Sequence, residues 1–195
     1  GGLPDGTVDA GTLATNSVTA AKLEVSAITG ADLPAGSVLQ VVSDTLTSTA
    51  STGQRASEGT WADTGLSVAI TPSSTSSKIV ITGMVNTGSE NAGDGVCILR
   101  LMRDSTAIAI GDAASNRPRT TTGRGSDSAG AASMLTKTVH WIDSPSSTSA
   151  VTYKIEFAAR GVGTLTAYIN KTSSDTDNTE HQRTASSLTL MEIAG

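Results

Sequence analysis

From residue 38 onward, short runs of apolar residues alternate with polar ones and are separated by clusters of Gly, Ser, Asn and Asp. In 151–157, Val, Tyr, Ile and Phe take every second position, and Thr, Lys and Glu take the positions between. Successive side chains of a strand point to opposite faces, so this period of two predicts a strand with one buried face. The pattern predicts eight or nine strands, and the candidate segments are 38–42, 66–71, 78–86, 96–103, 106–110, 134–143, 151–159, 163–170 and 187–193.

No helical period lasts for three turns after residue 38, so we predict an all-β head domain over residues 38–195. The number of strands and the polar turns favour a two-sheet β-sandwich of jelly-roll type, with a single barrel as the alternative. The last segment, 187–193, is apolar on both faces. We expect it to pack on its own core with one face and on neighbouring subunits with the other.

Residues 1–37 carry a repeat of ten residues, in which Leu recurs every tenth position and Val or Ile lies midway between. The hexamer LPDGTV at 3–8 returns as LPAGSV at 33–38. Two large apolar residues in ten cannot form a core within one chain, so we predict a stalk of three chains wound about one axis. A flexible linker is the alternative, but it does not require a fixed apolar register. Whether each unit is extended or helical stays open. The predicted trimer contacts are Leu3, Val8, Leu13, Val18, Leu23, Ile28, Leu33 and Val38.

Composition and charge limit the kinds of partner that this chain can be expected to bind. Aromatic residues make up 3% and charged residues 16% of the sequence, so the core must be built from β-branched side chains or completed by other subunits. With a net charge of -5 and no run of Lys or Arg, we expect no nucleic-acid partner. No stretch approaches the roughly 20 apolar residues that cross a bilayer, so we expect no membrane insertion. The chain opens Gly1-Gly2 without Met, from which we expect an upstream part to be missing.

Three features could carry chemistry, and each has a simpler explanation. The string 125–130 (GSDSAG), with His140 or His181 as a base, resembles a nucleophile loop but lies in a Gly/Ser-rich stretch, so we predict no enzyme activity. The single cysteine, Cys97, lies in an apolar run and is expected to be a buried thiol. We expect no cofactor. One weak candidate for a hard cation is the oxygen-rich set Asp175, Asp177 and Glu180, but it lacks a Gly at the sharp-turn position, so a solvated acidic loop is favoured.

Receptor contacts are predicted from an exposed aromatic residue and from the longest irregular segment, 111–132. Most aromatic residues are strand-embedded, so Trp141, Tyr153, Phe157 and Tyr168 are expected in the core. Trp61 is the expected exception. The alternative for the long segment is a loop that packs on a neighbouring subunit, because Arg is enriched in both kinds of interface. The predicted contact residues are Trp61, Arg117, Arg119, Arg124 and Asp127.

The stalk repeat and several blocks of the head (64–72, 76–80, 143–145, 152–154, 168–170 and 186–193) resemble tail-fibre and related virion fibre proteins of tailed bacteriophages, particularly marine ones. This resemblance implies a homotrimer on the virion, bound to other virion proteins, whose head attaches to a glycan or protein of the bacterial surface. It carries over no functional residues. The alternative is a purely structural virion component, such as a capsid decoration protein or a head fibre. A depolymerase, which would need paired carboxylates in a groove to cleave sugars, is less favoured because the head offers little room for such a groove.

Overall fold

The computed structural model describes residues 19, 30–53, 61–89, 97–123, 132–160 and 165–195. The chain divides into two units after Pro34, and the second unit, Ala35–Gly195, contains every strand of the described residues. A single turn of 3₁₀ helix, Gly30–Asp32, belongs to the first unit. The predicted stalk residues from Leu3 to Ile28 lie outside the described residues, whereas Leu33 is exposed and Val38 already begins the first strand of the head.

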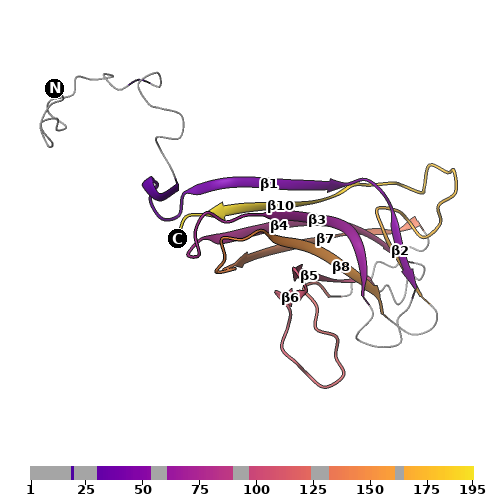
Figure 1. Cartoon of the computed structure of the whole chain (residues 1–195). Coiled ribbons are helices and arrows are strands. Elements are labelled where there is room, and N and C mark those ends of the chain that lie inside the picture. The colour runs from indigo at the N-terminus through magenta and orange to yellow at the C-terminus, as the bar shows by residue number, and fades with distance from the viewer. Residues whose placement is uncertain (1–18, 20–29, 54–60, 90–96, 124–131, 161–164) are drawn as a thin grey trace, which may run out of the picture. The chain divides into compact units, whose positions relative to one another are not determined.

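Two antiparallel sheets make up the head (Figure 1). The first sheet orders its long strands as β1 (Val38–Leu46), β10 (Ser186–Ile193), β4 (Lys78–Ser89) and β7 (Met134–Asp143). Two short strands extend it, because β9 (Thr166–Ile169) pairs with the end of β4 and β2 (Ala50–Gly53) pairs with β9. The second sheet has the order β3 (Ala62–Ile70), β8 (Val151–Ala159), β5 (Cys97–Arg103) and β6 (Thr106–Ile108).

The strand order defines a jelly roll. When β2 and β9 are set aside as extensions, eight strands remain in chain order. One sheet holds the first, eighth, third and sixth of them, and the other holds the second, seventh, fourth and fifth. Such an order arises when two Greek keys wrap the chain back and forth between facing sheets. The predicted jelly-roll sandwich is therefore confirmed, and the alternative of a single barrel is wrong.

Alternation along the strands places the core as expected. In β3, every second residue from Thr64 to Ile70 is buried, and in β10 the buried positions alternate with half-buried ones. Tyr153 and Phe157 of β8 are fully buried and supply much of the volume that few aromatic residues could give. A buried side chain of this size contributes about 1.5–3 kcal/mol to stability. The core therefore combines two large rings with many β-branched and Leu side chains.

Segment 187–193 forms most of a central strand, since β10 lies between β1 and β4. Its Leu188 and Leu190 face the core, while Met191 and Ile193 on the other face are half-buried. The expected contact of that second face with neighbouring subunits stays a prediction.

The structure differs from the sequence prediction in one strand and in one aromatic residue. The described residues form ten strands rather than eight or nine, because β2, with the sequence ASTG, has no apolar alternation and buries only Thr52. The expected burial of Trp141 also fails, since its ring is 44% exposed. Trp141 lies opposite Ile81 on β7, which pairs only with β4 among the described strands, so an edge position leaves part of the ring in solvent. Tyr168, in contrast, is buried as predicted.

Two fully buried polar residues hold the ends of strands together. The Glu192 carboxylate on β10 accepts hydrogen bonds from Gln40 on β1 and from Ser73 and Ser77 in the loop before β4. Asn170, directly after β9, binds the backbone of the β1–β2 connection and the hydroxyl of Ser186. Both networks satisfy their buried polar atoms, as a stable interior requires.

Gly88 in β4 allows a close backbone approach, and replacing it with Ala is expected to be costly. A Cβ at this position would overlap the carbonyl oxygen of Lys171. Backbone atoms cannot move aside as a flexible side chain can, so we expect Gly88→Ala to lower the free energy of unfolding by about 1–3 kcal/mol in urea. Gly53→Ala is the control, because a Cβ there meets no atom within 4 Å. Equal losses in the two variants would contradict this explanation.

Candidate binding site

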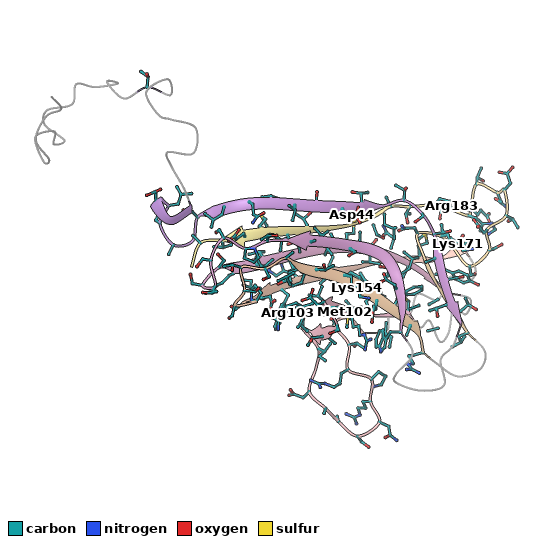
Figure 2. The ribbon with its side chains drawn as sticks, viewed as in Figure 1. Asp44, Met102, Arg103, Lys154, Lys171 and Arg183 are labelled. Atoms are coloured by element: carbon teal, nitrogen blue, oxygen red, sulfur yellow. The ribbon has the colours of Figure 1, made fainter. Side chains whose placement is uncertain are left out.

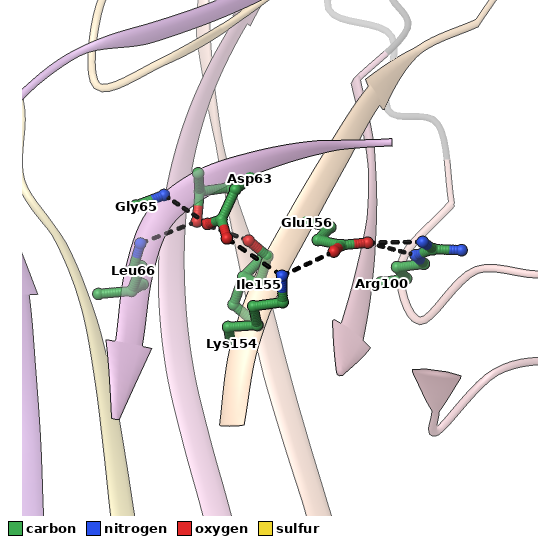
Figure 3. A network of polar contacts seen from close by, with 8 residues as sticks. Asp63, Gly65, Leu66, Arg100, Lys154, Ile155 and Glu156 are labelled. Atoms are coloured by element: carbon green, nitrogen blue, oxygen red, sulfur yellow. Dashed lines mark hydrogen bonds and ion pairs between the residues drawn. The ribbon is translucent and has the colours of Figure 1, made fainter. Parts of the chain in front are cut away.

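A chain of ion pairs crosses the outer face of the second sheet (Figure 3). Lys154 Nζ lies 3.2 Å from Asp63 Oδ2 and 3.0 Å from Glu156 Oε1. Glu156 Oε2 in turn accepts a hydrogen bond from Arg100 Nε at 2.8 Å and forms an ion pair with Arg100 Nη2 at 2.6 Å. The pKa of Lys154 lies above its usual value, first because of the hydrogen bond to Glu156 and then because of that to Asp63. These contacts hold the Arg100 guanidinium in one place.

The Arg100 guanidinium stacks on the ring of Trp61, with its central carbon 4.5 Å from the ring centroid. Such cation–π contacts contribute about 0.5–1 kcal/mol at exposed sites and fix the ring orientation. Trp61 comes directly before β3 and Arg100 lies in β5, and strand β8 lies between these two strands in the sheet. The pairing Asp63–Glu156–Arg100 across the three strands shows why these residues share one face.

The segment that follows β6 forms the opposite wall, and its return to β5 is anchored by hydrogen bonds. Thr121 N and Thr122 N both donate to Leu99 O, at 2.9 and 3.2 Å, and the Thr121 hydroxyl accepts from Leu101 N at 2.9 Å. Within the segment, Arg119 Nε donates to Gly111 O at 2.6 Å. The loop extends from the sandwich next to β6 (Figure 1).

Between this loop and the sheet lies a hollow of about 190 Å³. Its walls combine an aromatic residue, small or apolar residues, and two arginines. The lining residues are Trp61, Arg100, Ala107, Ile110, Pro118 and Arg119. An aromatic surface beside cationic hydrogen-bond donors can bind a flat or cyclic ligand that carries an anionic group.

The structure brings together two of the five predicted receptor-contact residues, Trp61 and Arg119. Arg117 is exposed on the same loop but does not line the hollow, and Arg124 and Asp127 lie outside the described residues. Sequence reasoning missed Arg100. The signal in the sequence was a charged residue within the otherwise apolar segment CILRLM. The period of two indicates which face of the strand Arg100 lies on, but it does not show that Trp61 lies on the same face of the sheet.

The acidic loop after β9 is organised by ion pairs. Asp175 accepts hydrogen bonds from Arg183 Nε and Nη2 at 2.9 and 2.7 Å, and Lys171 Nζ lies 3.4 Å from the same carboxylate. Lys171 and Arg183 lie at the same end of the head (Figure 2). The hydrogen bond from Arg183 comes first among the causes that hold the pKa of Asp175 below its usual value. Asp177 and Glu180 are exposed, and the described part of the chain contains no group of three or more His, Cys, Asp or Glu placed to share a metal ion.

Other residues with chemical potential have structural partners. Cys97 is buried as predicted, and burial raises the pKa of its thiol to about 12, which keeps it protonated and unreactive. His140 Nδ1 lies 3.5 Å from the Thr82 hydroxyl, and His181 Nδ1 lies 2.8 Å from that of Thr176. The Ser-containing string 125–130 lies outside the described residues. Among the described residues, no helix is long and apolar enough to span a membrane.

Fold and hollow together define the chain as a jelly-roll protein with a surface hollow lined by the residue before β3, by β5, and by β6 with the loop that follows it. The sequence matches no protein-family model and no curated protein. Among solved structures, the chain is similar to one titled "Structure of infectious bursal disease virus Gx strain", with a TM-score of 0.41 and 13% sequence identity. The match covers 80% of this chain and 37% of the other, so the chain spans little more than a third of that protein's length. The jelly-roll assignment rests on the strand order given above.

Proposed function

We propose that this chain is a subunit of a trimeric virion fibre, a tail fibre of a bacteriophage, whose jelly-roll head attaches the particle to the host surface. The observation that carries the attachment role is the hollow between Trp61 and Arg119, which is fixed by ion pairs on one side and by an anchored loop on the other. Sites prepared in this way bind without a large loss of side-chain entropy. A non-catalytic role is part of the proposal.

Two features support assembly from several copies. The ten-residue repeat of the first 37 residues offers evenly spaced apolar side chains to identical chains. On the outer face of the first sheet, Val41, Met191, Val80 and Ile142 lie directly opposite one another across four strands. Val41 is 57% and Ile142 55% exposed. An apolar row of this kind on a sheet face is typical of a surface that another protein covers, and a second copy is the partner that the repeat favours.

Attachment is tested by adding the fluorescently labelled full chain to the bacteria that the parent particle infects. We expect saturable binding measured by flow cytometry, and a reduced rate of particle adsorption when the protein is present in excess. Strains that the particle does not infect are the control and are expected to bind less. An absence of binding to every susceptible strain would sink the attachment role.

A capsid decoration protein or head fibre is the second candidate, favoured by the exposed apolar row, which suits a fixed packing contact within a particle. The two candidates differ in where the protein lies. Gold-labelled antibody against the head, viewed on intact particles, is expected at the tail. Label confined to the capsid would replace the tail-fibre proposal with the capsid one.

A further inference from the structure

We propose that the hollow between Trp61 and Arg119 binds a sugar ring that carries an anionic group, such as a carboxylate or a sulfate, within a longer surface polysaccharide. This inference rests on the attachment role proposed above and names the ligand class of the same site.

The size of the hollow points to one ring of a longer chain. Its volume of about 190 Å³ is below the roughly 300–1,000 Å³ typical of pockets that enclose a drug-sized ligand. A ligand held by such a small site needs additional contacts beyond it, as successive units of a polysaccharide would provide. Trp61 is half-buried and lines the hollow, and an indole ring is a flat apolar surface of the kind on which the C–H face of a sugar packs.

Charge around the hollow selects for an anion. The guanidinium of Arg100 is already paired with Glu156, so it mainly orients Trp61. Arg119 is different, because only its Nε is engaged, with Gly111 O, and no ion-pair partner for it is present among the described residues. The described loop 109–123 contains two arginines, Arg117 and Arg119, and one acidic residue, Asp112, for a net charge of +1.

The donors left on Arg119 suit a carboxylate or a sulfate. Guanidinium binds both groups through parallel N–H donors, and such charge-assisted hydrogen bonds are roughly twice as strong as neutral ones. The contact between Arg119 Nε and the Gly111 carbonyl holds the side chain against its own loop. The donor group is therefore positioned before the ligand arrives, which lowers the entropy lost on binding.

An acidic peptide is the main competing ligand, since it also brings carboxylates. The wall formed by Trp61, Ile110 and Pro118 favours the sugar, because an acidic side chain alone would leave these apolar surfaces uncovered. Binding of a peptide is therefore one outcome that the test must distinguish.

The test uses the full chain on a glycan array in which every acidic saccharide has a neutral partner with the same ring, followed by calorimetry on the strongest pair. We expect uronate-bearing or sulfated saccharides to bind at least tenfold more tightly than their neutral partners. Comparison of the uronate-bearing set with the sulfated set identifies which anion is bound. We expect Trp61→Ala and Arg119→Met each to weaken this binding at least tenfold. Arg117→Met, which removes the same charge outside the hollow, is expected to change it less than twofold.

Three results would overturn the inference: no binding of any acidic saccharide, equal binding of the neutral partners, or binding of oligo-glutamate as tight as that of the saccharide. Unchanged binding in both Trp61→Ala and Arg119→Met would overturn the site. Arg119 is exposed, so its variant is informative even where loss of Trp61 disturbs folding, which the thermal midpoint reports. If both variants still attach to susceptible cells like the original chain, attachment stands and this site is wrong. If the original chain does not attach at all, the attachment role fails independently.

Discussion

Replacing Glu192 with Gln is expected to lower the free energy of unfolding by about 2–3 kcal/mol at pH 7, because the buried carboxylate holds three segments together. Its Oε1 accepts hydrogen bonds from Ser73 N, Ser73 Oγ and Ser77 Oγ, each at 2.7 Å, and its Oε2 accepts one from Gln40 Nε2 at 2.6 Å. An amide has a single acceptor oxygen and turns an NH₂ group toward one set of donors. Urea unfolding at pH 7 measures the loss.

The same carboxylate makes stability depend on pH. Burial acts to raise the pKa of Glu192, but the hydrogen bonds from Gln40, Ser73 and Ser77 outweigh it and place the pKa below the ordinary value of 4.5. A group with a depressed folded-state pKa contributes stability above its unfolded pKa and loses it as the pH falls through the folded value. We therefore expect the difference between the original chain and Glu192→Gln to be full at pH 7 and to shrink below about pH 4.5.

Glu180→Gln is the matched control, because Glu180 is exposed in the acidic loop. Its change in unfolding free energy is expected to stay within about 0.5 kcal/mol. If Glu180→Gln and Glu192→Gln cost the same, or if the Glu192 difference does not depend on pH, the role given to this carboxylate is wrong.

Asn170→Ala is expected to cost about 3–5 kcal/mol, a larger loss than that expected of Glu192→Gln. Asn170 is fully buried, and its Nδ2 donates to Leu46 O at 2.8 Å and to Ser48 O at 3.0 Å. Its Oδ1 accepts a hydrogen bond from Ser186 Oγ at 2.6 Å. Truncation leaves the two part-buried carbonyls and the buried Ser186 hydroxyl without these partners, and each buried group that stays unmet is costly. The free energy of unfolding in urea gives the loss directly.

The backbone of Asn170 adds to this cost. Its φ is +59°, in the left-handed region that Asn tolerates and that disfavours Ala. Asn170→Gly removes the side-chain hydrogen bonds without the backbone strain, so we expect it to be less destabilising than Asn170→Ala by about 1 kcal/mol. Ser186→Ala removes one of the three contacts and also the acceptor of the Asn86 N–H at 3.0 Å, and is expected to cost about 1–3 kcal/mol. A loss below about 1 kcal/mol in Asn170→Ala would show that this residue does not hold the β1–β2 connection.

The sequence predicted the strands well where one face is buried. Alternation in 151–157 and 66–70 identified β8 and the second half of β3, because apolar residues recur at every second position only when one face of a strand is buried and the other is exposed to solvent. Strand β2 lacked that signal, because its pairing with β9 depends on backbone hydrogen bonds rather than on apolar side chains. Burial of Trp141 was predicted wrongly for a related reason, since local sequence does not show that β7 is an edge strand.

The candidate site was only partly predictable. Trp61 and Arg119 were recognised separately, as an aromatic residue outside the strands and as part of a long loop. Their meeting depends on the order β3-β8-β5-β6, which places distant segments beside each other and cannot be obtained from spacing. The orienting role of Arg100 through Glu156 depends on cross-strand register in the same way. The burial of polar groups such as Glu192 could not be predicted either, because the sequence does not distinguish a buried carboxylate from a solvent-exposed one.

Assembly of three chains is the claim on which the fibre proposal depends most, since the repeat of Leu3 to Val38 has no core within a single chain. Sedimentation equilibrium of the full chain measures it most directly. The expected mass is three times the 19.6 kDa of one chain, about 59 kDa, at every concentration tested. A mass of 19.6 kDa that does not change with concentration would contradict the account.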